Sequence, residues 1–203
     1  MQISDQTIAH PILDVVQMRH LLRGVSDRRG KIARMLDSGE LIALRRGLYA
    51  SRRDLDPHGL AGPIYGPSYL SFETALAWYG MIPEAVTEII SATIRRGNFF
   101  ENDFGRFRYL RVPATVYPVG IQRIADAGLP FLIASPTKAV CDQIAREAGF
   151  RSMADVERWL EGMRLELESP LNRGELNECA ANYGRPSVRW LQRFVERNAL
   201  IDG

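Results

Sequence analysis

The side chains best suited to acid–base or metal chemistry are few in this chain and form no recognisable site. The three histidines, His10, His20 and His58, all lie in the N-terminal part and share no metal-ligand spacing. The chain lacks a phosphate-binding glycine loop, a G-x-S-x-G nucleophile turn and an H-E-x-x-H zinc motif. We therefore predict no catalytic site, no bound metal and no cofactor.

A carboxylate–lysine motif of the kind found in nucleases is also missing. Lys138 is the only lysine outside the N-terminal part, and Pro136 stands where an E-x-K motif needs a carboxylate. Asp142 follows Lys138 by four residues, on the same helical face, and this spacing predicts a surface ion pair. The sequence thus favours a protein that is not an enzyme.

The two cysteines, Cys141 and Cys179, are expected to be buried free thiols. Each falls on the apolar side of a helical pattern, and their separation matches no metal-binding spacing. The chain has no signal peptide and no apolar run long enough to cross a membrane, so we expect a cytoplasmic protein. Its 203 residues, 46% of them hydrophobic and 25% charged, suffice for one large domain or two small ones.

Positive charge is concentrated in the first quarter of the sequence. Between Arg19 and Arg53, ten of 35 residues are Arg or Lys and three are acidic. Residues 1–53 carry a net charge of +5 (ten basic, five acidic), against −2 for residues 54–150 (eight and ten) and −1 for residues 151–203 (eight and nine). This local excess predicts contact with nucleic acid through the N-terminal part alone.

The apolar spacing in this part predicts two helices, over residues 15–22 and 28–38. The second helix begins after Ser26, a good N-cap. At 100° per residue, Lys31 and Arg34 lie opposite its apolar side. We expect both side chains to face outward, where they can contact DNA.

The neighbouring arginines extend this candidate surface. Arg28 and Arg29 lie in the first turn of the second helix and could reach phosphates from the helix end. Residues 41–50 then predict two short strands around a tight turn that carries Arg45 and Arg46, a pair suited to a narrow minor groove or flanking phosphates. A helix followed by a basic hairpin is the layout of a winged helix-turn-helix, a DNA-binding fold. The alternative for the helix taken alone is a charged face that contacts only solvent.

A second group of arginines lies on or beside two predicted strands, over residues 86–94 and 104–112. Its members are Arg95, Arg96, Arg106, Arg108 and Arg111, and the first four form the candidate partner surface. Because Arg106 and Arg108 alternate with aromatic residues, we expect the arginines on one face of the strand and the aromatics on the other. The group is either the solvent-facing side of a sheet or a cationic surface for an acidic or nucleic-acid-binding partner.

The whole pattern predicts an α+β protein of two domains. Residues 54–67 are dense in Gly and Pro and predict an irregular linker. Beyond it we expect a helix over residues 71–79 and three or four helices from Pro136 to the end. Four strands are expected, over residues 86–94, 104–112, 116–119 and 129–134. The predicted domains are a winged helix-turn-helix over residues 1–56 and a mixed α/β domain with C-terminal helices over residues 57–203.

Residues 68–84 read Ser-Tyr-Leu-Ser-Phe-Glu-Thr-Ala-Leu-Ala-Trp-Tyr-Gly-Met-Ile-Pro-Glu, a segment with a specific likeness. Further segments occur in a matching order at residues 46–49, 93–96, 104–109 and 134–142. Together they resemble the AbiEi-type antitoxins over residues 20–150. One departure is Thr137, where that family usually carries a glutamate before the lysine.

The resemblance implies a two-part protein. In that family an N-terminal winged helix represses the operon encoding antitoxin and toxin, and the C-terminal domain counters the toxin. The toxin is AbiEii, a nucleotidyltransferase-like protein of abortive-infection systems directed against phage. The pairing is classed as type IV, so operator DNA is an expected partner and a stable antitoxin–toxin complex is not.

Two other functions stay open from the sequence. The chain could be a stand-alone transcription factor whose second domain senses a small molecule, with aromatic residues such as Trp78, Tyr79 and Phe107 lining a pocket. It could also be an enzyme acting on nucleic acid or on the toxin. A downstream nucleotidyltransferase gene would favour the antitoxin over the sensor.

Overall fold

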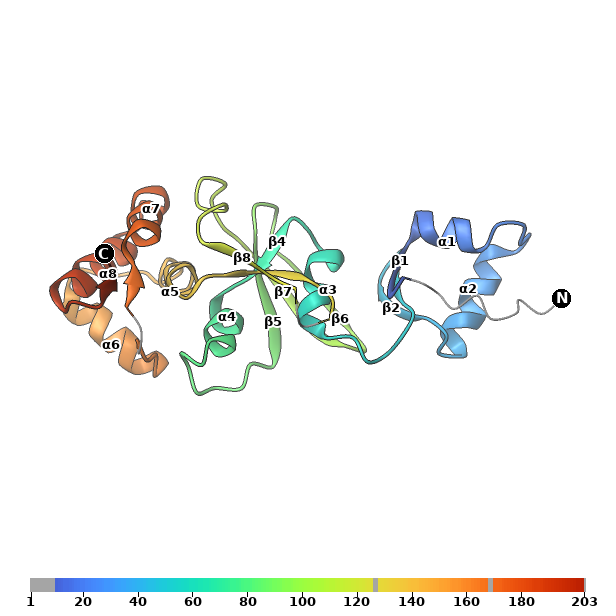
Figure 1. Cartoon of the computed structure of the whole chain (residues 1–203), viewed down its shortest axis with the longest axis horizontal. Helices are drawn as coiled ribbons and strands as arrows, with labels where there is room; N and C mark the ends of the chain where they lie inside the picture. The colour runs from blue at the N-terminus through green and yellow to red at the C-terminus, as the bar shows by residue number, and fades with distance from the viewer. Residues whose placement is uncertain (1–9, 126–127, 168–169, 203) are drawn as a thin grey trace.

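The computed structural model describes residues 10–125, 128–167 and 170–202 and has an α+β architecture (Figure 1). Three groups of elements follow one another along the long axis of the molecule. A group of helices and short strands lies at the N-terminal end, a sheet with helices on both faces lies in the middle, and further helices form the C-terminal end (Figure 1). No helix in the described ranges is long and apolar enough to cross a bilayer.

The N-terminal group contains two helices and a three-stranded antiparallel sheet in the order β1-β3-β2. Its elements are β1 (Ile12–Asp14), α1 (Val15–Leu21), α2 (Arg28–Asp37), β2 (Ile42–Arg45) and β3 (Leu48–Ala50). The two predicted helices and the hairpin are confirmed. Asp14 caps α1 in a capping box with Gln17, and Asp27, one residue after the predicted Ser26, caps α2.

Two apolar clusters form the interior of the described part of the chain. The smaller one joins α1, α2 and the N-terminal sheet through Leu13, Met18, Leu22, Met35 and Leu41. The larger one runs through the central sheet and the C-terminal helices, and it also takes in Ile42, Leu44, Leu48 and Ala50 of the hairpin. The hairpin therefore packs against the central sheet as well as pairing with the N-terminal strand β1.

The central sheet has six strands in the order β6-β7-β5-β4-β9-β8. They are β4 (Ser68–Leu70), β5 (Glu88–Thr93), β6 (Asn98–Asn102), β7 (Gly105–Arg111), β8 (Ile121–Ile124) and β9 (Phe131–Ala134). Pairs β5–β7 and β4–β9 are parallel and the other three are antiparallel. Three predicted strands are confirmed, but the one over residues 116–119 is wrong, because those residues form turns that lead into β8.

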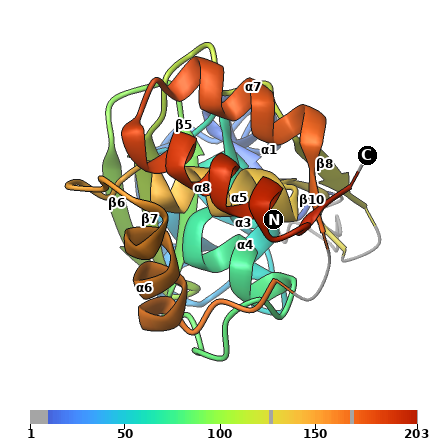
Figure 2. The same cartoon turned by 90° about the vertical axis from the view of Figure 1, so that its left-hand side faces the viewer.

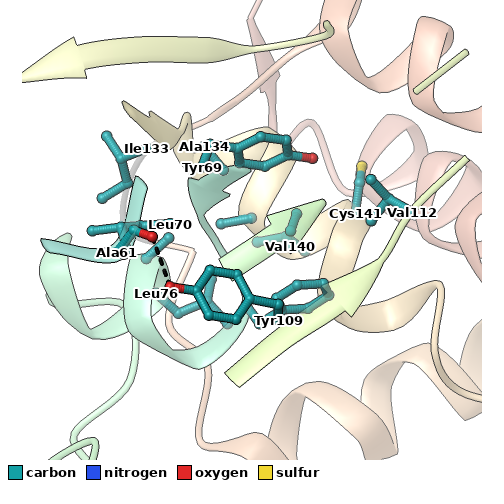
Figure 3. Close-up of a cluster of buried hydrophobic side chains, with 14 of the residues drawn as sticks. Ala61, Tyr69, Leu70, Leu76, Tyr109, Val112, Ile133, Ala134, Val140 and Cys141 are labelled. Carbon is teal, nitrogen blue, oxygen red and sulfur yellow. Dashed lines mark hydrogen bonds between the residues drawn. The ribbon is translucent and has the colours of Figure 1, made fainter. Parts of the chain in front are cut away.

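Helices cover both faces of this sheet. Helix α3 (Pro57–Ile64) lies on the face that carries Tyr109, and α5 (Pro136–Ile144) lies on the face that carries Tyr69, whose hydroxyl donates to Asp142. The end of α4 (Phe72–Trp78) meets α3, where the rings of Trp78 and His58 are 5.3 Å apart. Figure 3 shows the side chains between these layers, where the Tyr109 hydroxyl of β7 donates a hydrogen bond to the Ala61 carbonyl of α3 at 2.6 Å. The sheet and α3 are thus joined by a polar contact inside an apolar layer.

The linker predicted over residues 54–67 is wrong, because α3 occupies most of it. Asp56 caps this helix through the backbone N–H of His58, and Pro57 takes the first helical position, where its missing N–H costs nothing. Leu60 and Ile64 are fully buried against the sheet. Burial of this apolar side outweighs the low helix propensity of the glycines.

The C-terminal helices pack beyond α5, as Figure 2 shows from that end of the molecule. They are α6 (Met153–Met163), α7 (Arg173–Tyr183) and α8 (Pro186–Arg197), together with a short parallel pair of β10 (Leu171–Asn172) and β11 (Ile201–Asp202). The predicted C-terminal helices are confirmed. They bury Cys179 beside α5, so both cysteines are buried free thiols, as predicted.

The predicted ion pair between Lys138 and Asp142 forms, but its predicted place on the surface is wrong. Both side chains are completely buried on α5. Asp142 also accepts hydrogen bonds from the hydroxyls of Tyr69 (2.9 Å), Ser71 (2.7 Å) and Tyr183 (2.6 Å). Burial first, and then the negative charge of Asp142, raise the pKa of both tyrosines far above the ordinary value. The two phenols therefore remain protonated donors.

Candidate nucleic-acid interface

Helix α2 presents four of the predicted DNA-contacting side chains. Arg28, Arg29 and Arg34 are exposed, and Lys31 is half-buried. Met35 is buried in the smaller apolar cluster. It lies one turn after Lys31, so that lysine stands at the border of the packed side and is half-buried, while Arg29 and Arg34 lie farther from Met35 around the helix.

Gly30 makes room for the N-cap carboxylate of α2. The Asp27 carboxylate accepts a hydrogen bond from the Gly30 backbone N–H at 2.9 Å. A Cβ atom on Gly30 would lie 2.0 Å from Oδ2 of Asp27, so a larger residue would push the capping carboxylate aside. The sequence predicted a cap one residue earlier and thus missed that an acidic group sits beside the basic side of α2.

The hairpin turn holds the other two predicted residues, and they differ in their surroundings. Both Arg45 and Arg46 are exposed. The Arg45 guanidinium donates from Nε to the Ile64 carbonyl of α3 at 2.6 Å and from Nη1 to the Arg46 carbonyl at 3.2 Å. At the same turn, a Cβ on Gly47 would lie 2.8 Å from the Val15 side chain at the start of α1.

The structure thus divides the six predicted residues into two sets on separate elements. The four on α2 form one set, and Arg45 and Arg46 form the other, beside α1 and α3. Within the described part of the chain, none of the six forms a salt bridge with a carboxylate. By contrast, the nearby Arg52 pairs with Asp54 at 3.0 Å and Arg53 with Asp103 at 3.3 Å.

The second arginine group is largely neutralised by its own sheet. Arg108 on β7 makes two hydrogen bonds to Glu88 on β5, from Nε at 2.6 Å and from Nη2 at 2.9 Å. Arg106 pairs at 3.4 Å with Glu101, its direct partner across β6 and β7. The hydrogen bond from Arg108 lowers the pKa of the Glu88 carboxyl, which stays charged and keeps Arg108 occupied.

The loop after β5 carries the other two residues of that group. The Arg95 guanidinium donates to the Gly66 carbonyl at 2.9 Å and lies 4.6 Å from the centre of the Tyr65 ring. Arg96 is exposed, and its carbonyl accepts a hydrogen bond from the Tyr65 hydroxyl at 2.9 Å. The expected alternation along β7 is confirmed, because Phe107 and Tyr109 are buried whereas Arg106 and Arg108 are exposed.

The aromatic residues named as possible pocket lining make separate contacts. Phe107 is fully buried in the sheet. The Tyr79 hydroxyl donates to Gln122 at 3.2 Å, and Trp78, 40% exposed, packs against the rings of His58 and Phe131. Over the described ranges, no three His, Cys, Asp or Glu side chains are grouped so as to hold a metal ion.

Neither a protein-family model nor a curated protein matches this chain.

Proposed function

We propose that this protein is a DNA-binding antitoxin that represses its own operon. The proposal treats α1, α2 and the β2–β3 hairpin as a winged helix-turn-helix and the rest of the chain as the antitoxin part. The observation that carries it is the concentration of positive charge in the N-terminal part: residues 1–53 carry a net charge of +5, against −2 for residues 54–150. Among the described residues, the six cations on α2 and the hairpin form no salt bridge with a carboxylate.

In the proposed complex, α2 lies against the major groove and supplies most of the contacts. The exposed Arg34 and the half-buried Lys31 face the groove, and Arg28 and Arg29 reach flanking phosphates from the first turn. Arg46 at the hairpin turn approaches an adjacent phosphate or the minor groove. Arg45 holds the hairpin against α3 through the Ile64 carbonyl and contributes to its position as well as its charge.

The antitoxin activity is proposed for residues 57–203. Its support is the ordered set of sequence segments that resemble the AbiEi-type antitoxins, and the toxin it would counter is an AbiEii-like nucleotidyltransferase. No stable complex with that toxin is expected. Arg106 and Arg108 are paired with glutamates, whereas Arg95 and Arg96 at the loop after β5 form no salt bridge with a described carboxylate, so we assign the candidate antitoxin surface chiefly to these two.

The DNA contact is tested by removing charge from α2. We expect R29A/R34A to weaken binding of a duplex from the region upstream of the gene. Arg29 is assigned to a phosphate and Arg34 to the groove, so the loss of one phosphate contact should reduce the slope of log K against log salt by about 0.9. Fluorescence anisotropy at several salt concentrations measures both quantities.

The matched control is R106A/R108A, which removes the same charge from paired arginines of the sheet. This control should bind DNA with the salt slope of the parent protein. Equal slopes for all three proteins would rule out α2 as the contact. Co-expression of R29A/R34A with the neighbouring toxin gene, scored by growth, should still show neutralisation, because the antitoxin part is unchanged.

A further inference from the structure

The outer side of α8 carries a row of arginines that belongs to neither proposed surface. Its members follow one another at intervals of four residues: Arg185, Arg189, Arg193 and Arg197. All four are exposed. Arg185 is the N-cap residue of α8, and the other three lie on the helix itself. The net charge of −1 over residues 151–203 hides this row, because it averages the row with acidic residues elsewhere in that part of the chain.

The packing of α8 fixes the direction in which the row points. Three residues of α8 are fully buried, namely Val188, Leu191 and Val195. Because residues four apart differ by about 40° around a helix, the three helical arginines stay within about 80° of one another, on the side away from the buried residues. Figure 2 shows α8 at the end of the molecule, and Figure 1 places that end opposite α2 along the long axis. The row therefore faces solvent, far from the proposed DNA contact.

The positive charges of the row are not neutralised by the rest of the fold. Within the described ranges, none of the four arginines forms a salt bridge with a carboxylate. Arg189 donates from Nη2 to the Gly184 carbonyl at 3.1 Å, and the Arg193 guanidinium lies 4.8 Å from the centre of the Trp190 ring. Both contacts orient a guanidinium group and leave its charge uncompensated.

This arrangement opposes the stability of the helix that carries it. Like charges four residues apart on a helix repel each other. The first turn of α8 contains no acidic residue, and Arg185 and Arg189 stand at the N-terminal end, where the helix dipole disfavours cations. A bound polyanion would relieve both effects. Folding alone thus gives no reason for the row, whereas binding of an anion does.

The regular spacing of the row favours the backbone of a nucleic acid as that anion. A guanidinium group binds phosphate through two parallel hydrogen bonds. At 1.5 Å per residue, the row is about 18 Å long. Phosphates of one strand follow each other every 3.4 Å along a B-form duplex, so a row of this length spans about five of them.

Two other polyanionic partners fit the row less well. Proteins that bind single strands combine a basic groove with free aromatic faces for stacking, but the row stands on the convex side of a helix and Arg193 covers the Trp190 ring. A helix that binds a membrane surface inserts its apolar side into the lipid. The apolar side of α8 is instead buried in the core.

From these observations we propose that α8 is a second DNA contact, which binds the phosphate backbone of a duplex without reading its sequence. It uses none of the residues assigned to α2, the hairpin or the candidate antitoxin surface. The choice of DNA over RNA rests on the proposed function, whereas the phosphate contact itself does not.

The test measures binding of a random-sequence duplex by fluorescence anisotropy at several salt concentrations. It starts from the full-length R29A/R34A protein, so that α2 contributes little. Adding R189A/R193A should weaken binding by about tenfold at low salt, because two charge-assisted contacts are lost. The slope of log K against log salt should fall by about 1.8. Adding R189K/R193K instead keeps both charges and should keep the slope.

The matched control adds R158A/R164A to the same starting protein. It removes two arginines from the same end of the molecule, but these are paired with Asp155 and Glu84. Affinity and slope should both stay unchanged. Circular dichroism checks that each variant is folded, and R185A/R197A, at the two ends of the row, should reproduce the loss seen with R189A/R193A.

Unchanged affinity and slope in folded R189A/R193A and R185A/R197A proteins would overturn the contact. An equal loss in the R158A/R164A control would also overturn it, because net charge alone would then explain the binding. Tighter binding of a single strand of the same length would overturn the duplex assignment, and tighter binding of an RNA duplex would overturn the choice of DNA. If R29A/R34A binds the upstream duplex like the parent protein, the proposed contact of α2 fails while the comparison on α8 still holds.

Discussion

Lys138 and Asp142 form a charge pair that water does not reach. Lys138 Nζ also lies 5.6 Å and 5.1 Å from the ring centres of Tyr69 and Tyr183, and those same tyrosines donate their hydroxyls to Asp142. The residues come from β4, α5 and α7, so the network joins the sheet to the C-terminal helices. Ser71 completes it, because its hydroxyl donates to Asp142 instead of capping α4.

Removing one partner of this pair should be far more damaging than removing both. We expect K138M to lower the free energy of unfolding by about 3–5 kcal/mol, since it strands a carboxylate in the interior. The double variant K138M/D142L should recover part of that loss, because no charge remains buried. Urea denaturation followed by circular dichroism measures both.

The recovery should be incomplete for a specific reason. The hydroxyls of Tyr69, Ser71 and Tyr183 lose their common acceptor in the double variant, and each unmet donor is costly. A double variant less stable than K138M would show that the buried charge of Asp142 is not the cause of the loss of stability in K138M. A K138M protein as stable as the parent would contradict the buried-pair argument altogether.

At the scale of elements, the sequence predicted helices better than it predicted the segments between them. Helices α1, α2 and α4 follow apolar spacings that packing then satisfies, and their positions were predicted to within one or two residues. Helix α3 was missed because its glycines and prolines lower local propensity. Its stability comes from burial of one side against a sheet that forms from distant residues.

The segment over residues 116–119 shows the opposite error. Val116 and Val119 are buried, so their apolar character is real, but they are buried as parts of successive turns. The two valines of this four-residue segment therefore indicated burial and not a strand. A pattern of four residues is too short to distinguish a strand from a pair of turns, because apolar residues are buried in both.

Helix α6 depends on a carboxylate at its N-terminus, and this makes its stability sensitive to acid. Asp155 accepts hydrogen bonds from the backbone N–H groups of Arg151 and Ser152, and from the Ser152 hydroxyl, which lowers its pKa from 3.8 to about 2. A lowered pKa means that the folded state holds the charged form more tightly. The contribution of Asp155 to the free energy of unfolding is therefore complete above pH 4 and is lost as the pH falls toward 2.

We expect D155N to reduce the steepness with which stability falls between pH 4 and pH 2. The measurement is the urea midpoint at a series of pH values, compared with the parent protein. D37N, at an exposed carboxylate that ends α2, is the matched control and should keep the steepness of the parent. A D155N curve parallel to that of the parent across this window would contradict the role of the carboxylate.

At the scale of the whole molecule, the hairpin joins the N-terminal group to the central sheet. Its apolar residues belong to the larger cluster, Arg45 bonds to α3, and Asn102 Nδ2 of β6 donates to the Leu44 carbonyl at 3.0 Å. The predicted domain boundary, between residues 56 and 57, falls at the start of α3 and not in a free linker. Expression of residues 57–203 alone would expose the surface that the hairpin covers.

The candidate DNA contact could be predicted from the sequence only in part. Helical phasing placed Arg34 outside the core, because the apolar spacing of α2 is local. The pairing of Arg108 with Glu88 was beyond reach, since it depends on the parallel register of β5 and β7. The tether between Arg45 and Ile64 was beyond reach for the same reason, because it depends on how α3 docks.

The distribution of the two lysines gives the folded protein an unusual reactivity toward amine-directed reagents. Lys31 and Lys138 are the only lysines in the chain; Lys138 is completely buried and Lys31 is half-buried on α2. We expect a short pulse of an N-hydroxysuccinimide ester to modify the native protein at Lys31 and to leave Lys138 untouched. Peptide mass mapping after the pulse locates each label.

One reagent then reports two separate events. Modification of Lys138 should appear only under conditions that unfold the protein, so its rate measures global opening. Protection of Lys31 by operator DNA should follow occupancy of the α2 surface. Labelling of Lys138 in the folded protein, or of Lys31 at an unchanged rate with saturating DNA, would contradict the corresponding assignment. A shortage of lysine thus turns two amines into probes of folding and of binding.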